Sequence, residues 1–263
     1  MAIITRREFS RSSVIYIIFG IALICVMTLI GASAFLRVNY FVVNSSGFYT
    51  TEQIIEASGV SGGDNLLYLN TQTVSQNIKN ELPFVNNVEI VKNLPDTLII
   101  TVTESNAVAY LLFEGDTIII DSSGRVLERT QHLSNAGSGA SVTINNKKLI
   151  EIRGVLINDA RVGRQLRAEP GLESILTTMQ NVLVAMEREG ITNDVDYLDV
   201  SNINNIYFGY KGIYRIIVGG IADLRVKLNR LAADIQRIQE VYPNSRGVYN
   251  MTDDPNRYKF TPE

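Results

Sequence analysis

One short segment has the residue types and spacing of a catalytic serine. The run Gly59-Val60-Ser61-Gly62-Gly63 matches G-x-S-x-G, the turn that exposes the nucleophile of a serine hydrolase between a strand and a helix. The serine would need a histidine as its base, and the one histidine of the chain, His132, adjoins a Gly/Ser-rich stretch at 134–141. Because a short helix is expected before the motif, its glycines are better interpreted as a linker. We therefore expect no catalytic residue, and an anchored serine hydrolase using Ser61 is kept as an alternative.

Three carboxylates that lie close together could bind a metal ion: Asp194, Asp196 and Asp199. Their spacing does not match an EF-hand loop, and no glycine turns the chain between them. The sequence also lacks a Walker motif, a dinucleotide-binding pattern and a zinc-ligand pattern. We therefore expect no metal, no cofactor and no small-molecule substrate.

Composition argues against nucleic-acid binding and against thiol chemistry. The net charge is −3 and the isoelectric point is about 5.4, so a basic surface for nucleic acid is not expected. The single cysteine, Cys25, lies inside an apolar segment, which leaves no disulfide and no thiol nucleophile for the rest of the chain. The function is therefore expected to come from binding surfaces.

An uncharged apolar run extends from Val14 to Leu36. As a helix at ~1.5 Å per residue it would reach about 35 Å, enough to cross ~30 Å of hydrocarbon. Three arginines precede the run and only Arg37 follows it directly, which predicts a cytoplasmic N-terminus and an external remainder. Ala32-Ser33-Ala34 resembles a cleavage site, but the apolar core is longer than that of a signal peptide, so we expect an uncleaved anchor.

Residues 37–104 predict a small α+β unit in the order strand, helix, helix, strand, strand. Thr50 and Gln53 have the spacing of a capping box, which starts a helix that should end at Ser58-Gly59. Leucines at 66–69 lead into a second helix, which Thr71 could cap and Pro83 ends. Alternating apolar residues on both sides of a turn at 93–96 predict a hairpin, with Leu98 and Ile100 on its buried face.

Residues 105–260 predict a larger mixed sheet with two longer helices. Apolar stripes at helical spacing over 172–186 and 221–238 indicate helices that pack on this sheet. Alternating patterns predict strands at 108–113, 117–121, 195–200, 205–208 and 214–218. Segments 248–251 and 257–260 are expected to close the sheet.

Several motifs carry a resemblance to a known family. The segment 82–104 contains Leu-Pro-Phe-Val, then V-x-I-x-K-x-L-P-x-T-L, then V-x-E, and it resembles the POTRA domain of the FtsQ/DivIB cell-division proteins. The likeness continues through IDSSGRV at 120–126 and GVYNM at 247–251, and it ends near Phe260. It extends over essentially the whole chain.

The resemblance implies an α+β architecture with a single N-terminal transmembrane helix. The implied parts are a cytoplasmic tail at 1–13, the transmembrane helix at 14–36, a β-α-α-β-β POTRA domain at 37–104, a mixed α/β "β domain" with a sheet packed by two longer helices at 105–260, and a C-terminal tail at 261–263. The cytoplasmic membrane at the division septum is the implied location.

The resemblance also implies a function without catalysis. FtsQ/DivIB proteins are scaffolds and regulators of the divisome that bind two small bitopic partners, FtsB/DivIC and FtsL, and through them the septal peptidoglycan synthase. They use the last strand region, which corresponds here to Asn256, Arg257, Tyr258, Lys259 and Phe260. Strand addition to an exposed edge would suit such a role, although charges at an edge also protect it from aggregation. We expect Tyr258 and Phe260 on one face as anchors. A POTRA component of membrane assembly or secretion is the second alternative.

Overall fold

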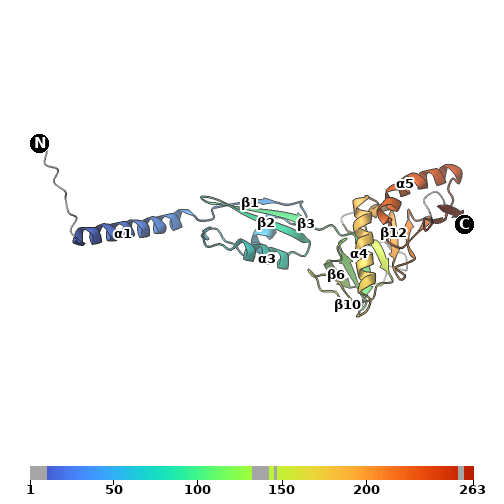
Figure 1. Ribbon diagram of the computed structural model, residues 1–263, viewed down its shortest axis with the longest axis horizontal. Coiled ribbons are helices and arrows are strands. Elements are labelled where there is room, and N and C mark those ends of the chain that lie inside the picture. The colour runs from blue at the N-terminus through green and yellow to red at the C-terminus, as the bar shows by residue number, and fades with distance from the viewer. Residues whose placement is uncertain (1–10, 132–141, 145–146, 254–257) are drawn as a thin grey trace. The chain divides into compact units, whose positions relative to one another are not determined.

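The computed structural model describes residues 11–131, 142–144, 147–253 and 258–263, without the side chains of 11–14, 28–30 and 32–34. The chain forms two compact units, Met1–Glu104 and Ser105–Glu263, each built from its own helices and sheets (Figure 1). The expected combination of helices and mixed sheets is confirmed.

The apolar run near the N-terminus forms helix α1 (Arg11–Phe35). Most of the large apolar side chains from Ile15 to Met27 are exposed on it. Within the described residues, no helix combines the length and the apolar character needed to cross a membrane.

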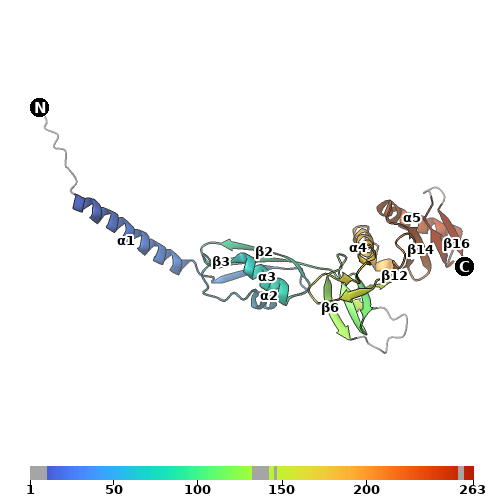
Figure 2. The same cartoon turned by 60° about the horizontal axis from the view of Figure 1, so that its bottom comes forward.

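A three-stranded sheet with two helices makes up the rest of the first unit. Its strands are β1 (Tyr40–Asn44), β2 (Val85–Asn93) and β3 (Thr97–Glu104), in the order β1-β3-β2, with β1 parallel and β2 antiparallel to β3. Helices α2 (Thr51–Ser58) and α3 (Thr71–Glu81) lie over one face of the sheet (Figure 2). The predicted order of elements is therefore confirmed.

Local signals decide where both helices begin, although the cap of α3 is not the expected residue. The capping box of Thr50 and Gln53 is present, and Gly59 ends α2 in the left-handed conformation at φ 68°. The cap of α3 is Asn70, whose Oδ1 accepts hydrogen bonds from two backbone N–H groups, so the expectation of a Thr71 cap is wrong. Residues 66–68 form a turn and Leu69 lies outside any helix, and the N–H of Leu66 donates to the carbonyl of Leu36 at 2.8 Å.

Alternation along β3 leads to a first prediction. Leu98 and Ile100 are fully buried under the helices, whereas Ile99 faces the other side of the sheet and is half-buried. Ile100→Ala should therefore cost about 2–5 kcal/mol of unfolding free energy, and Ile99→Ala should cost less than half as much. Urea unfolding of the two variants measures the difference, and equal losses would show that the assigned face is wrong.

The second unit contains a nine-stranded mixed sheet in the order β16-β15-β14-β13-β12-β9-β4-β5-β6. Its strands are β4 (Ala109–Phe113), β5 (Asp116–Ile120), β6 (Val126–Gln131), β9 (Ile150–Arg153), β12 (Val195–Asp199), β13 (Ile206–Tyr210), β14 (Tyr214–Gly219), β15 (Gly247–Asn250) and β16 (Lys259–Pro262). Two short pairs lie outside it: β7 (Thr143–Ile144) with β8 (Lys147–Lys148), and β10 (Ile157–Asp159) with β11 (Arg167–Ala168). A 3-10 turn, η1 (Thr192–Asp194), precedes β12.

Two helices cover this sheet with the apolar stripes seen in the sequence. Helix α4 (Glu173–Arg188) and helix α5 (Leu224–Val241) bury most of those residues in one core with the strands. Ile221 is the exception, since it precedes α5 and is exposed. Packing on the home sheet is thus confirmed for both stripes.

Candidate functional site

The G-x-S-x-G segment does not have the geometry of a nucleophile elbow. It follows α2 instead of a strand, and the backbone N–H of Ser61 donates to Oδ2 of Asp64 at 2.9 Å within a turn. His132, the proposed base, lies outside the described residues. The linker interpretation of the glycines is therefore confirmed at Gly59, which is the left-handed C-cap of α2.

The acidic cluster at 194–199 is used within the protein. Each carboxylate has a partner: the Tyr210 hydroxyl for Asp194, the Lys148 ammonium for Asp196 and the Tyr207 hydroxyl for Asp199. Burial opposes ionisation of Asp199, but hydrogen bonds from Ser201 and Tyr207 outweigh it and lower the pKa of Asp199. Among the residues that the structure describes, no group of histidine, cysteine or carboxylate side chains could hold a metal ion.

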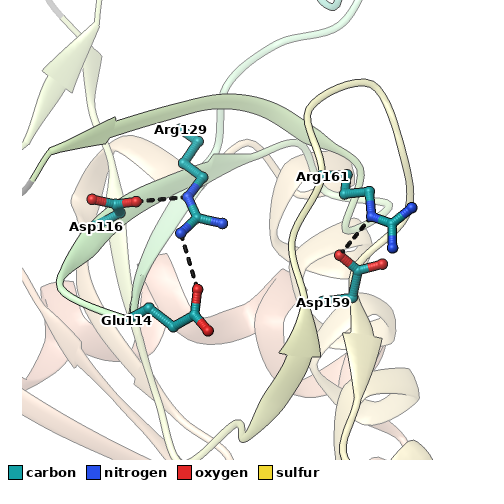
Figure 3. Close-up of polar contacts among 5 residues, drawn as sticks. All are labelled: Glu114, Asp116, Arg129, Asp159 and Arg161. Atoms are coloured by element: carbon teal, nitrogen blue, oxygen red, sulfur yellow. Dashed lines mark hydrogen bonds and ion pairs between the residues drawn. The ribbon is translucent and has the colours of Figure 1, made fainter.

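The nine-stranded sheet has two edges, and β6 forms the first of them. The 163–166 segment covers the beginning of β6, because the N–H of Val126 donates to the carbonyl of Arg164 at 2.8 Å and the N–H of Gly163 donates to that of Val126 at 2.8 Å. Further along, Arg129 forms ion pairs with Asp116 at 2.6 Å and with Glu114 at 3.1 Å, and Arg161 pairs with Asp159 at the end of the neighbouring strand β10 (Figure 3). Covering loops and charges of this kind protect a sheet edge from pairing.

Strand β16 forms the other edge, and no second described strand pairs with it. It runs antiparallel to β15, and beyond the strand the N–H of Glu263 donates to the carbonyl of Arg246 at 2.9 Å. Hydrogen bonds alternate along an antiparallel pair, so the N–H and C=O of Phe260 point away from β15. This outward donor and acceptor could pair with a strand from another chain.

Pro262 limits the length of this edge, and sequence reasoning missed it. The strand was expected to end at Phe260, but Thr261 and Pro262 continue the ladder opposite Val248 and Gly247. The backbone of Pro262 points away from β15, as that of Phe260 does, but proline has no N–H. No outward hydrogen-bond donor is therefore available in the strand beyond Phe260. Within sheets, proline is largely confined to edge strands. Pro262 could therefore have been included in the predicted strand on the basis of the sequence.

The aromatic side chains of Phe260, in β16, and of Tyr258, directly before that strand, pack on their own domain. The Phe260 ring lies 6.0 Å from that of Tyr214 and 5.4 Å from that of Tyr242, while the Tyr258 ring lies 6.1 Å from that of Tyr249. Tyr258 and Phe260 therefore share the face that carries α5, as expected, and both are partly buried against the core. Of the other predicted site residues, Lys259 is exposed, whereas Asn256 and Arg257 lie outside the described residues.

Gly247 allows β16 to lie close to its neighbour. A Cβ atom at this position would be 2.3 Å from the carbonyl oxygen of Thr261 and 2.8 Å from two ring carbons of Phe260. Both distances are shorter than real Cβ contacts, so only glycine fits without moving the edge strand. The contact comes from the pairing of β15 with β16 and cannot be seen in the local sequence.

A buried carboxylate connects α5 to β15 and to the edge. Asp234 accepts a hydrogen bond at 2.8 Å from the Tyr249 hydroxyl and another at 2.8 Å from Nε of Arg230. Burial and the bond to Asp234 raise the pKa of Tyr249, so its hydroxyl stays protonated and donates. The guanidinium of Arg230 in turn lies 5.1 Å from the centre of the Tyr258 ring, a cation–π distance.

Known proteins resemble both units of the chain. Residues 36–105 match the family described as "POTRA domain, FtsQ-type". The cell division protein DivIB of Clostridium tetani is 27% identical over 235 residues, which are 89% of this chain and 83% of that protein. DivIB of Clostridium botulinum strain Hall is 29% identical over 203 residues, 76% of this chain and 72% of the relative. The cell division protein FtsQ of Corynebacterium glutamicum is 28% identical over 119 residues, 44% of this chain and 53% of the relative.

These matches support the FtsQ/DivIB family. The resemblance stated from the sequence motifs is thereby confirmed. The match to the FtsQ-type POTRA domain ends where the first compact unit of the chain ends, at Glu104 and Ser105. The candidate site of the second unit is the outer edge of β16, with the backbone of Phe260 and the exposed side chain of Lys259.

Proposed function

We propose that this chain is a non-catalytic, membrane-anchored scaffold of bacterial cell division that holds partner proteins by strand addition to the outer edge of β16. The observation that carries the proposal is the difference between the two sheet edges: the 163–166 segment covers the beginning of β6, whereas no second described strand pairs with β16, whose Phe260 has an outward backbone donor and acceptor. The similar proteins DivIB and FtsQ are named cell division proteins, which supports a role of this chain in cell division.

The partners that suit this edge are FtsB/DivIC-like and FtsL-like bitopic proteins, which would connect the chain to septal peptidoglycan synthesis. An added strand would obtain its register from the backbone of Phe260. Lys259 is exposed on the face opposite the aromatic side chains, so it favours a partner strand with an acidic side chain beside it.

The membrane anchor is part of the same proposal. It is supported by the uncharged run from Val14 to Leu36 and by the arginines that precede it, at 6, 7 and 11. The exposed apolar side chains of α1 suit a lipid environment better than water. The N-terminus is then cytoplasmic, and both compact units act outside the membrane at the division septum.

A charge reversal on the edge tests the proposed function. Lys259→Glu should weaken binding of the DivIC/FtsL-like pair about tenfold, roughly 1.4 kcal/mol, and should reduce recruitment of the pair to the septum. The melting temperature should not change, because the Lys259 side chain is exposed. Arg237→Glu is the matched control, since it makes the same charge change at an exposed position of α5.

Phe260→Ala complements this test, because it removes an edge aromatic that also packs on Tyr214 and Tyr242. It should lower both the melting temperature and the affinity, the latter by at least about thirtyfold, or ~2 kcal/mol. Normal binding by Lys259→Glu and by a folded Phe260→Ala variant would exclude this edge as the site.

A further inference from the structure

Three loops of the POTRA domain come together at the end where the chain arrives from α1. The carbonyl of Leu36, the first residue after α1, accepts a hydrogen bond from the N–H of Leu66, and the N–H of Val38 donates to the carbonyl of Asp64, both at 2.8 Å. The N–H of Asn39 donates to the carbonyl of Asp96, also at 2.8 Å. Segments 36–40, 63–68 and 93–96 are thus joined by backbone hydrogen bonds.

These three segments expose large apolar side chains. Tyr68 is 80% exposed, Tyr40 64%, Leu94 55% and Leu67 51%, and none of the four belongs to the core of the domain. The neighbouring polar contact, from Nζ of Lys92 to the carbonyl of Leu67 at 3.5 Å, fixes the loop without covering these side chains. Exposed apolar side chains that gather at one end of a domain mark an interaction surface.

We propose that this end of the POTRA domain rests on the membrane and inserts Tyr68, Leu67 and Leu94 into the lipid interface. The inference rests on the proposed membrane anchor. The covalent connection to α1 identifies lipid as the partner of this surface. Helix α1 ends at Phe35, and the very next residue, Leu36, is already hydrogen-bonded to the 63–68 loop. The tether is therefore too short to lift these loops away from a bilayer that contains α1.

The side chains also suit this environment chemically. Tyrosine places an apolar ring and a polar hydroxyl at the boundary between acyl chains and headgroups, where aromatic residues are enriched. The adjacent leucines add apolar area, and the exposed Arg37 can reach lipid phosphates.

The absence of tryptophan from the sequence allows a direct test with single-tryptophan reporters. The full chain is reconstituted into phosphatidylcholine bilayers whose acyl chains carry bromine, a short-range quencher of indole fluorescence. Tyr68→Trp and, independently, Leu67→Trp report on the proposed surface. Phe19→Trp reports on the anchor. Phe48→Trp is the matched control at the opposite end of the domain, where the N–H of Phe48 donates to Glu104, the last residue of β3.

Tyr68→Trp and Leu67→Trp should lose most of their emission in brominated bilayers and shift to shorter wavelength in unbrominated ones, whereas Phe48→Trp should do neither. Quenching of Phe19→Trp without quenching at positions 67 and 68 would overturn this inference and leave the anchor intact. If Phe19→Trp is also unquenched, the anchor itself is wrong. An emission shift at Tyr68→Trp that requires added partner protein would overturn the lipid assignment in favour of a protein contact.

Discussion

Gly247→Ala should detach β16 from β15 and weaken partner binding at least about thirtyfold, or ~2 kcal/mol, although it changes no residue of the proposed binding strand. The added Cβ would lie 2.3 Å from a backbone oxygen of Thr261, and backbone cannot rotate away as a flexible side chain can. Because β16 is at the edge, the strand can move outward while the core between β4 and β15 stays folded. Affinity for the DivIC/FtsL-like pair and amide hydrogen exchange of β15 are the measurements.

Gly220→Ala is the control for this variant. Gly220 lies in the same domain, and the nearest atom that its added Cβ would meet is 3.8 Å away. It should bind the partners normally and keep its hydrogen-exchange protection. Normal affinity of Gly247→Ala, together with faster exchange in β15, would show that the position of β16 does not matter for binding.

Asp234→Ala should cost about 2–3 kcal/mol of unfolding free energy, the largest effect of a single polar residue that we expect here. Most of this loss comes from the buried Tyr249 hydroxyl, which would be left without its acceptor. The ion pair with Arg230 contributes less, because the Arg230 side chain is 34% exposed and solvent screens it. Thermal or urea unfolding measures the loss.

A double-mutant cycle identifies the source of this energy. Adding Tyr249→Phe to Asp234→Ala removes the stranded hydroxyl, so the double variant should be more stable than Asp234→Ala alone. Strictly additive losses would contradict the assignment of the cost to the hydroxyl. A second cycle that combines Asp234→Ala with Arg230→Ala, read out by partner affinity, tests whether the Asp234–Arg230 link positions Tyr258 beside the edge.

Local sequence patterns were sufficient to predict an element wherever the residues that determine it lie within a few positions of one another. The Thr50–Gln53 capping box predicted the start of α2, because both partners belong to the same helical turn. Alternation at Leu98 and Ile100 predicted the buried face of β3, because side chains alternate along any strand. The cap of α3 was placed one residue too late, because Asn70 and not Thr71 accepts hydrogen bonds from the backbone N–H groups of Gln72 and Thr73.

The amino-acid sequence by itself determined the family, the order of elements in the POTRA domain and the two amphipathic helices of the second unit. It also indicated which strand is the candidate site, through the resemblance. Only the tertiary structure decided that β16 is an edge, that Phe260 points its backbone outward and its ring inward, and that Gly247 and Pro262 shape that edge. The physical reason is that an edge is defined by the strands that do not pair with it. That property depends on the whole sheet order, which joins segments as distant as β6 and β16 in one structure.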